Sequence, residues 1–107
     1  MAKQRQLFRV AIERSGMVRH GGEAFSCSIV DLTEKGVRLR INGSFEVGEE
    51  LQLQFAIAEG HTLEGIVQVT HREPPYLGAE IIRMPPDDQR RLSNFIEELN
   101  ALNMSGI

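Results

Sequence analysis

The sequence has a single cysteine, Cys27, among its 107 residues, and this scarcity limits its covalent and metal chemistry. One cysteine excludes an intramolecular disulfide and leaves no cysteine pair at a zinc-ligand spacing. A chain without disulfides suits a reducing compartment, so we expect a cytoplasmic protein. His20, His61 and His71 lie far apart in the sequence and are predicted to be solvated surface residues, so no metal site is expected.

Long apolar runs are also missing. No stretch approaches the roughly 20 apolar residues of a membrane-spanning helix. The first nine residues carry Lys3, Arg5 and Arg9 with no apolar run behind them, which is unlike an export signal. We therefore expect a protein that is neither exported nor inserted into a membrane.

Aromatic residues and excess positive charge, which nucleic-acid binders need, are scarce as well. Tryptophan is absent, tyrosine occurs once, and the net charge is −3. Proteins that bind DNA or RNA usually have excess positive charge along one face, and single-strand binders add aromatic stacking platforms. We therefore expect no DNA or RNA partner.

The sequence also lacks the motifs of common enzymes. We find no combination of acid, base and nucleophile and no glycine-rich phosphate loop, so we predict no catalytic residue and a protein that is not an enzyme. What is present is a local basic patch: residues 1–20 hold five basic residues and one acid. Such a short patch on an acidic chain suits a small anion better than a long polyanion.

Apolar and polar residues alternate in six short segments, a pattern that is typical of half-buried β-strands. Turn-forming pairs separate the segments: Ser15-Gly16, Gly21-Gly22, Asn42-Gly43, Glu59-Gly60 and Pro74-Pro75. The side chains predicted to point inward are Phe8, Val10, Ile12, Phe25, Cys27, Ile29, Val37, Leu39, Ile41, Leu51, Leu53, Phe55, Ile57, Val67, Val69, Leu77, Ala79 and Ile81. Short strands without intervening helices predict an antiparallel β-barrel or sandwich.

The periodicity changes after Pro85-Pro86. Asp87 and Asp88 favour the start of a helix, and apolar residues then recur at helical spacing, which predicts a helix over 86–102. These apolar residues are Leu92, Phe95, Ile96 and Leu99. We expect the stripe to close one end of the barrel, although a helix that binds a partner would carry the same stripe.

Two short motifs contain residues that can bind a ligand. Arg5 and Arg9 form an R-x-x-x-R ahead of the first strand, within a basic arm over 1–9 that we expect to be flexible. Guanidinium groups can grip phosphate oxygens or the O6/N7 edge of guanine, and they can stack on a purine. The alternative interpretation is a solvated basic tail.

The second motif is D-x-T-x-x-G, formed by Asp31, Thr33 and Gly36 and expected in the loop between the second and third strands. An aspartate can accept hydrogen bonds from guanine N1–H and N2–H, and a threonine hydroxyl can contact phosphate or base. Gly36 permits the positive φ of a tight turn. The alternative is a simple hairpin in which Asp31 and Thr33 bond to their own backbone.

Taken together, the two motifs resemble the paired signature R-x-x-x-R and (D/N)-x-S-x-x-G of the PilZ domain family. The residues 37–40 (Val-Arg-Leu-Arg), 65–69 (Gly-Ile-Val-Gln-Val) and 77–82 (Leu-Gly-Ala-Glu-Ile-Ile) continue the likeness. It extends from Arg5 to Leu99. Thr33 departs from the commoner serine, which keeps the hydroxyl and adds a methyl group, and Gln4 leaves Arg5 without an adjacent arginine.

The resemblance implies an all-β fold: a six-stranded antiparallel PilZ-like β-barrel with a C-terminal α-helix, forming a single domain over 1–107. It also implies a receptor for cyclic di-GMP (c-di-GMP), a bacterial second messenger, that needs no cofactor and signals to an unidentified downstream protein. Arg5, Arg9, Asp31, Thr33 and Gly36 would form the ligand site. The alternative within the family is a protein-interaction module that binds no nucleotide.

Overall fold

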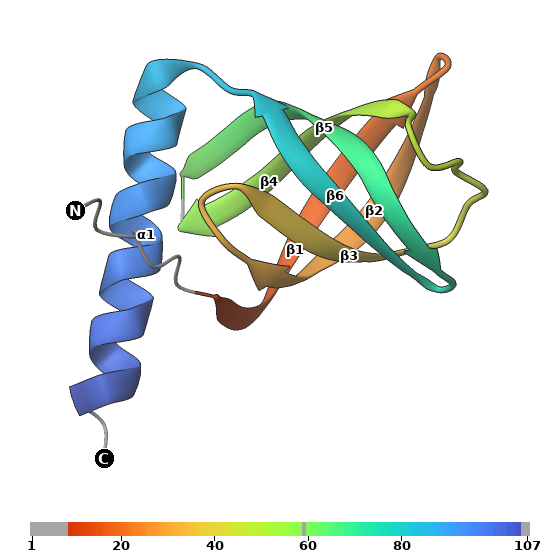
Figure 1. The fold of residues 1–107 in the computed structure, drawn as a ribbon. Coiled ribbons are helices and arrows are strands. Elements are labelled where there is room, and N and C mark those ends of the chain that lie inside the picture. The colour runs from red at the N-terminus through yellow and green to blue at the C-terminus, as the bar shows by residue number, and fades with distance from the viewer. Residues whose placement is uncertain (1–8, 59, 106–107) are drawn as a thin grey trace, which may run out of the picture.

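The computed structural model describes residues 9–58 and 60–105. Within this range, six antiparallel strands close into a barrel and one helix follows them (Figure 1). The order around the barrel is β1-β2-β3-β6-β5-β4, and β4 pairs back onto β1. The elements are β1 Val10–His20, β2 Glu23–Leu32, β3 Gly36–Ile41, β4 Glu50–Ala58, β5 His61–Glu73, β6 Tyr76–Arg83 and α1 Pro86–Ser105. The predicted fold class is confirmed.

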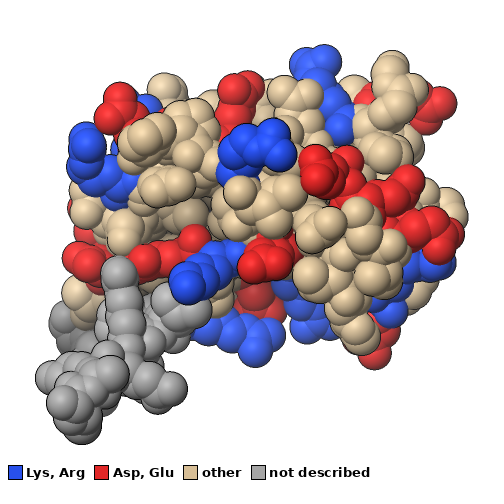
Figure 2. Space-filling view, turned by 45° about the horizontal axis from the view of Figure 1, so that its top comes forward, with Lys and Arg blue, Asp and Glu red and all other residues tan. Residues whose placement is uncertain are grey.

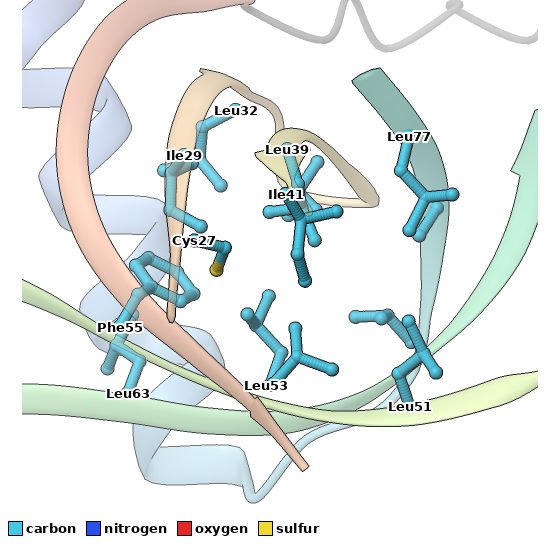
Figure 3. Packing of buried hydrophobic residues seen from close by; sticks show 14 of the residues in the cluster. Cys27, Ile29, Leu32, Leu39, Ile41, Leu51, Leu53, Phe55, Leu63 and Leu77 are labelled. Atoms are coloured by element: carbon cyan, nitrogen blue, oxygen red, sulfur yellow. The ribbon is translucent and has the colours of Figure 1, made fainter. Parts of the chain in front are cut away.

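The barrel interior is filled by the apolar residues of the alternating pattern. Figure 3 shows these side chains pointing toward one another from different strands, with Ile29, Leu39, Leu53 and Phe55 among them. Those four side chains are at most 2% exposed. Because successive side chains of a strand point to opposite faces, the polar residues between them lie on the outer surface. Phe8 lies outside the described residues.

The Ser15-Gly16 pair is not a turn, and this prediction is wrong. Both residues lie in the middle of β1, where Gly16 pairs with Cys27 of β2 and with Phe55 of β4. A Cβ at Gly16 would stand 3.1 Å from the Cys27 Sγ atom and 3.3 Å from the Phe55 Cβ atom. The glycine is therefore explained by close strand packing rather than by chain reversal.

Phe45 closes one end of the barrel, which the sequence pattern did not predict. It lies in the eight-residue connection between β3 and β4, and its side chain is 2% exposed. Its ring meets Phe25 edge-on at 5.2 Å and His20 at 5.9 Å between centroids. His20 is half-buried, and its Nε2 atom donates a hydrogen bond to the Glu49 carboxylate at 3.1 Å, so it is not the freely solvated residue that we predicted.

The helix α1 covers the opposite end of the barrel (Figure 1). It runs to Ser105, beyond the predicted end at residue 102. Leu92 and Ile96 are 2% and 0% exposed, and Phe95 and Leu99 pack against the same core. The apolar stripe therefore faces the protein's own barrel, as predicted. Among the described residues, no helix combines the length and the apolar character that crossing a membrane requires.

The start of α1 is fixed to the barrel by polar contacts. The Asp88 Oδ2 atom accepts the backbone N–H of Glu64 at 3.1 Å, and the Gln89 side-chain amide donates to the Met84 carbonyl at 3.0 Å. Asp87 and Asp88 in the first turn also suit the positive end of the helix dipole. The helix position thus depends on specific hydrogen bonds as well as on apolar packing.

Candidate functional site

Asp31 reaches the outer surface of the barrel because β2 contains a bulge. The pairing of β2 with β3 shifts between Ile29 and Asp31: Ile29 lies opposite Leu39, and Asp31 lies opposite Arg38. Without the extra residue, strict alternation would direct Asp31 inward with Ile29. The bulge instead aligns Asp31 with the outward Arg38 while Leu32 remains buried. The expected loop is correspondingly short, because Asp31 and Leu32 belong to β2 and Gly36 begins β3.

Thr33 shapes the turn between these strands. Its Oγ1 atom accepts the backbone N–H groups of Lys35 at 3.1 Å and of Gly36 at 2.9 Å. Its own backbone N–H donates to the Gly36 carbonyl at 2.9 Å. The Thr33 hydroxyl therefore bonds to its own turn, as the simple-hairpin alternative predicted, and it fixes the backbone that follows Asp31.

Gly36 is required for a different reason from the one predicted. Its φ is not among the positive values of the chain, so the expected left-handed turn conformation is wrong. A Cβ atom at Gly36 would instead stand 3.0 Å from the carbonyl oxygen of Ala79, which precedes its partner Glu80 on β6. A backbone oxygen cannot rotate away, so the absence of a side chain lets β3 and β6 pair closely beside the turn.

Replacing Gly36 with alanine is therefore expected to lower the free energy of unfolding by about 1–3 kcal/mol, because the new methyl group forces the two strands apart. The matched control is Gly78→Ala on β6, where the nearest atom to a new Cβ would lie at an ordinary 3.5 Å. That variant is expected to be neutral or more stable by up to about 1 kcal/mol. Urea unfolding followed by circular dichroism measures both, and equal stabilities would contradict the packing explanation.

Asp31 forms the centre of a cluster of charged side chains. The Arg9 Nη2 atom donates to its Oδ2 atom at 3.1 Å, and the Arg38 Nη1 atom lies 3.9 Å from the same oxygen. The side chain of Asp31 is 20% exposed, whereas that of Arg9 is 66% exposed. The structure thus brings together Arg9 and Asp31, which are 22 residues apart in the sequence. Arg5 lies outside the described residues.

Arg38, Arg40 and Tyr76 belong to the same surface and were not predicted as site residues. The Arg38 guanidinium carbon lies 4.5 Å above the centroid of the Tyr76 ring, and its Nη2 atom lies 3.9 Å from Glu73. Arg40 is the next outward residue on β3. The sequence contained a signal for the two arginines, because the alternation of residues 37–40 places both on the polar face of the strand. It contained none for Tyr76, which reaches Arg38 only because β3 pairs with β6.

Cys27 is buried in the barrel, as predicted. It is 8% exposed, and burial raises the pKa of its thiol to about 11, because the thiolate would lose its hydration there. A thiol that stays protonated at neutral pH is a poor nucleophile.

The pKa of Glu49, beside His20, is shifted in the opposite direction: a hydrogen bond from the Glu46 backbone N–H stabilises the carboxylate and lowers the pKa.

Charge on the molecular surface is mixed. Figure 2 shows basic and acidic side chains interspersed on one face of the molecule rather than separated into large regions of one sign. Each arginine of the Asp31 cluster likewise has a carboxylate within 3.9 Å. Among the residues that the structure describes, no group of three or more His, Cys, Asp or Glu side chains is arranged to hold a metal ion.

Comparison with known proteins identifies one family and several similar folds. The family model described as PilZ domain matches residues 3–98. No curated protein matches the chain by sequence.

Three solved structures have the same fold. The Bacillus subtilis inhibitor of motility MotI/DgrA has a TM-score of 0.78 at 18% identity, over 94% of this chain and 52% of that one. YcgR from Escherichia coli in complex with c-di-GMP has a TM-score of 0.80 at 14% identity, over 97% of this chain and 49% of that one. The PilZ domain of YcgR from Escherichia coli with c-di-GMP has a TM-score of 0.74 at 13% identity, over 97% of this chain and 98% of that one. The chain thus spans about half the length of the first two proteins.

Proposed function

The chain belongs to the PilZ domain family, and we propose that it is a receptor, not an enzyme, that binds c-di-GMP and signals this to a partner protein. The observation that carries the proposal is the position of Asp31. A bulge turns its carboxylate onto the outer face of the barrel, where Arg9 lies at 3.1 Å and Arg38 at 3.9 Å. A carboxylate flanked by guanidinium groups offers complementary partners for a guanine and for a phosphate.

In this proposal Asp31 accepts hydrogen bonds from N1–H and N2–H of one guanine. Arg9 and Arg5 bind phosphate oxygens or the O6/N7 edge of the base, since a guanidinium group can donate two parallel hydrogen bonds to either. Thr33 and Gly36 act by fixing the turn beside Asp31: the Thr33 hydroxyl bonds to the Gly36 N–H, and Gly36 allows the close approach to Ala79. The ligand itself supplies two negative charges and two guanines.

The contact between Arg9 and Asp31 is suited to rearrangement on binding. Because the Arg9 side chain is 66% exposed, solvent screens the pair, and such exposed pairs contribute only about 0–1 kcal/mol. Exchanging this contact for charge-assisted hydrogen bonds to a phosphate and a guanine is therefore favourable. Movement of Arg9 from Asp31 to the ligand would alter the surface ahead of β1, which is the region that we propose a partner protein reads.

The structural neighbours support c-di-GMP as the ligand, but they do not indicate which cellular process this protein controls. Both YcgR structures contain c-di-GMP, and the Bacillus subtilis neighbour is an inhibitor of motility. Because this chain spans about half the length of two of these proteins, the partner and the controlled process are proposed only as a class: a downstream protein that recognises the ligand-bound barrel. We propose that it acts in the cytoplasm, on the sequence argument from its lone cysteine.

Isothermal titration calorimetry of the protein with c-di-GMP tests this function, and a separate titration with GTP is the control for specificity. We expect a dissociation constant in the micromolar range or below for c-di-GMP, and for GTP, which carries only one guanine, much weaker binding. Arg9→Ala is expected to weaken binding about tenfold or more, because a hydrogen bond to a charged group contributes about 1.5–3 kcal/mol. Arg90→Ala is the control, since Arg90 is an exposed arginine of α1 that pairs with Asp87.

Two results would contradict the proposal. If the folded wild-type protein binds neither nucleotide, the chain is a PilZ-like module that acts through protein contact alone. If Arg9→Ala and Arg90→Ala weaken c-di-GMP binding equally, the binding reflects general surface charge and not the Asp31 cluster.

A further inference from the structure

A hollow lies on the outer surface of the barrel beside the Asp31 cluster. It has a volume of about 620 Å³ and spans β1, β2 and β3, with Ser15, Ser28, Arg40 and Asn42 among its lining residues. This volume is within the range of about 300–1,000 Å³ that is typical of small-molecule sites. The proposed contacts of Asp31 and Arg9 account for one guanine and one phosphate, so the other half of the dinucleotide requires a place nearby.

The register of the strands places the hollow next to Asp31. Asp31 pairs with Arg38 and Ser28 pairs with Arg40 across β2 and β3. Arg38 and Arg40 both point outward and are two residues apart, which corresponds to about 6.6 Å at about 3.3 Å per residue. Arg38, whose guanidinium lies 3.9 Å from Asp31, therefore connects the Asp31 cluster to the hollow on one continuous surface.

The lining of the hollow suits a nucleoside. Ser15 and Ser28 provide hydroxyl groups that can donate and accept, and Asn42 provides an amide with both functions, so ribose hydroxyls and base edges can be satisfied there. The Arg40 side chain is 51% exposed, and its Nη2 atom lies 3.9 Å from Glu13. Such a guanidinium can turn to the O6/N7 edge of a guanine, which is the contact that it makes most often with bases.

The charge balance favours one ligand per chain over two. Three arginines of this surface, Arg9, Arg38 and Arg40, lie within 3.9 Å of three carboxylates, those of Asp31, Glu73 and Glu13. The formal charges of these six groups cancel. One dianion therefore adds two negative charges to a surface that is neutral overall, whereas two stacked copies would add four and repel each other more strongly.

We propose that this hollow binds the second guanosine half of the same c-di-GMP molecule, with Arg40 contacting the O6/N7 edge of that guanine. The inference rests on the proposed function, in which Asp31 holds the first guanine. It assigns the hollow to ligand binding and makes Arg40 a residue that distinguishes a dinucleotide from a mononucleotide. Glu13 competes with the ligand for Arg40.

Amide chemical shifts measured by NMR during titration separate the two halves of the site. Cyclic GMP, which carries one guanine and one phosphate, is expected to shift the resonances of Asp31, Thr33 and Gly36 only. The compound c-di-GMP is expected to shift these and also Ser15, Ser28 and Arg40. If c-di-GMP shifts only the first group, the hollow is not part of the site and the inference is overturned. If neither ligand shifts Asp31 or Gly36, the proposed function itself fails.

Calorimetry on variants provides the second test. Arg40→Ala is expected to weaken c-di-GMP binding at least about tenfold and to leave cyclic GMP binding unchanged. Glu13→Gln is expected to strengthen c-di-GMP binding severalfold, because it releases Arg40. Arg90→Ala on α1 is again the control. Unchanged c-di-GMP affinity in Arg40→Ala, or a stoichiometry of two ligands per chain, would overturn the inference while the proposed function stands.

Discussion

Replacing Asp31 with asparagine is expected to weaken c-di-GMP binding by about two orders of magnitude. The carboxylate offers two acceptors to the N1–H and N2–H groups of guanine, whereas the asparagine amide would place a donor against one of them. Losing a charge-assisted contact and leaving a donor without a partner together cost about 3 kcal/mol, which corresponds to roughly a hundredfold in affinity. The two side chains have nearly the same shape, so packing is retained.

Calorimetry on Asp31→Asn, beside Glu73→Gln, provides the measurement and its matched control. Glu73 also pairs with Arg38, at 3.9 Å, but its side chain is 69% exposed and it has no proposed contact with guanine. Glu73→Gln is therefore expected to bind as the wild type does or slightly more tightly. An Asp31→Asn protein that keeps wild-type affinity would show that Asp31 does not recognise the guanine edge.

Replacing Ile96 with alanine is expected to lower the free energy of unfolding by about 2–5 kcal/mol. Ile96 is 0% exposed and lies on the face of α1 that packs against the barrel. Its truncation removes buried apolar contacts and leaves a cavity that the surrounding strands fill only partly. Since small domains are stable by about 5–15 kcal/mol, this is a large share of the total.

Urea unfolding followed by circular dichroism measures this effect, with Glu97→Ala as the control. Glu97 is the neighbouring exposed residue on the same helix, and its replacement is expected to change stability by no more than about 0.5 kcal/mol. A lower midpoint with an unchanged slope would assign the loss to the folded packing. If Ile96→Ala unfolds as the wild type does, the stripe contributes little to the barrel, and a partner becomes its better explanation.

The strands and the helix were predictable because their signals are local. Alternation of apolar and polar residues depends only on the direction of successive side chains, so Cys27, Leu39 and Leu53 were correctly assigned to the interior. The helical spacing of Leu92 and Ile96 likewise indicated which face of α1 is buried. The PilZ family was recognisable because its motifs are short and have fixed spacing.

The errors occurred where packing between distant segments decides the outcome. Ser15-Gly16 has the composition of a turn, but Gly16 is explained by the approach of Cys27 and Phe55. Gly36 has the composition of a left-handed turn residue, but it is explained by the approach of the Ala79 carbonyl. In both cases, a glycine can be required either by a turn conformation or by the close approach of another strand, and the sequence alone does not distinguish the two.

The sequence by itself determined the strand composition, the polar face of each strand and the amphipathic helix, because each of these depends on neighbours within a few residues. It also determined the family, because two motifs with fixed internal spacing occur together in it. Only the tertiary structure decided that Arg38 and Tyr76 share one surface with Asp31, and that Phe45 closes a barrel end. Those outcomes depend on strand order, on register and on one bulge. The bulge in β2 sets the direction of Asp31, and barrel closure brings β6 to β3, so the site is a property of the whole fold.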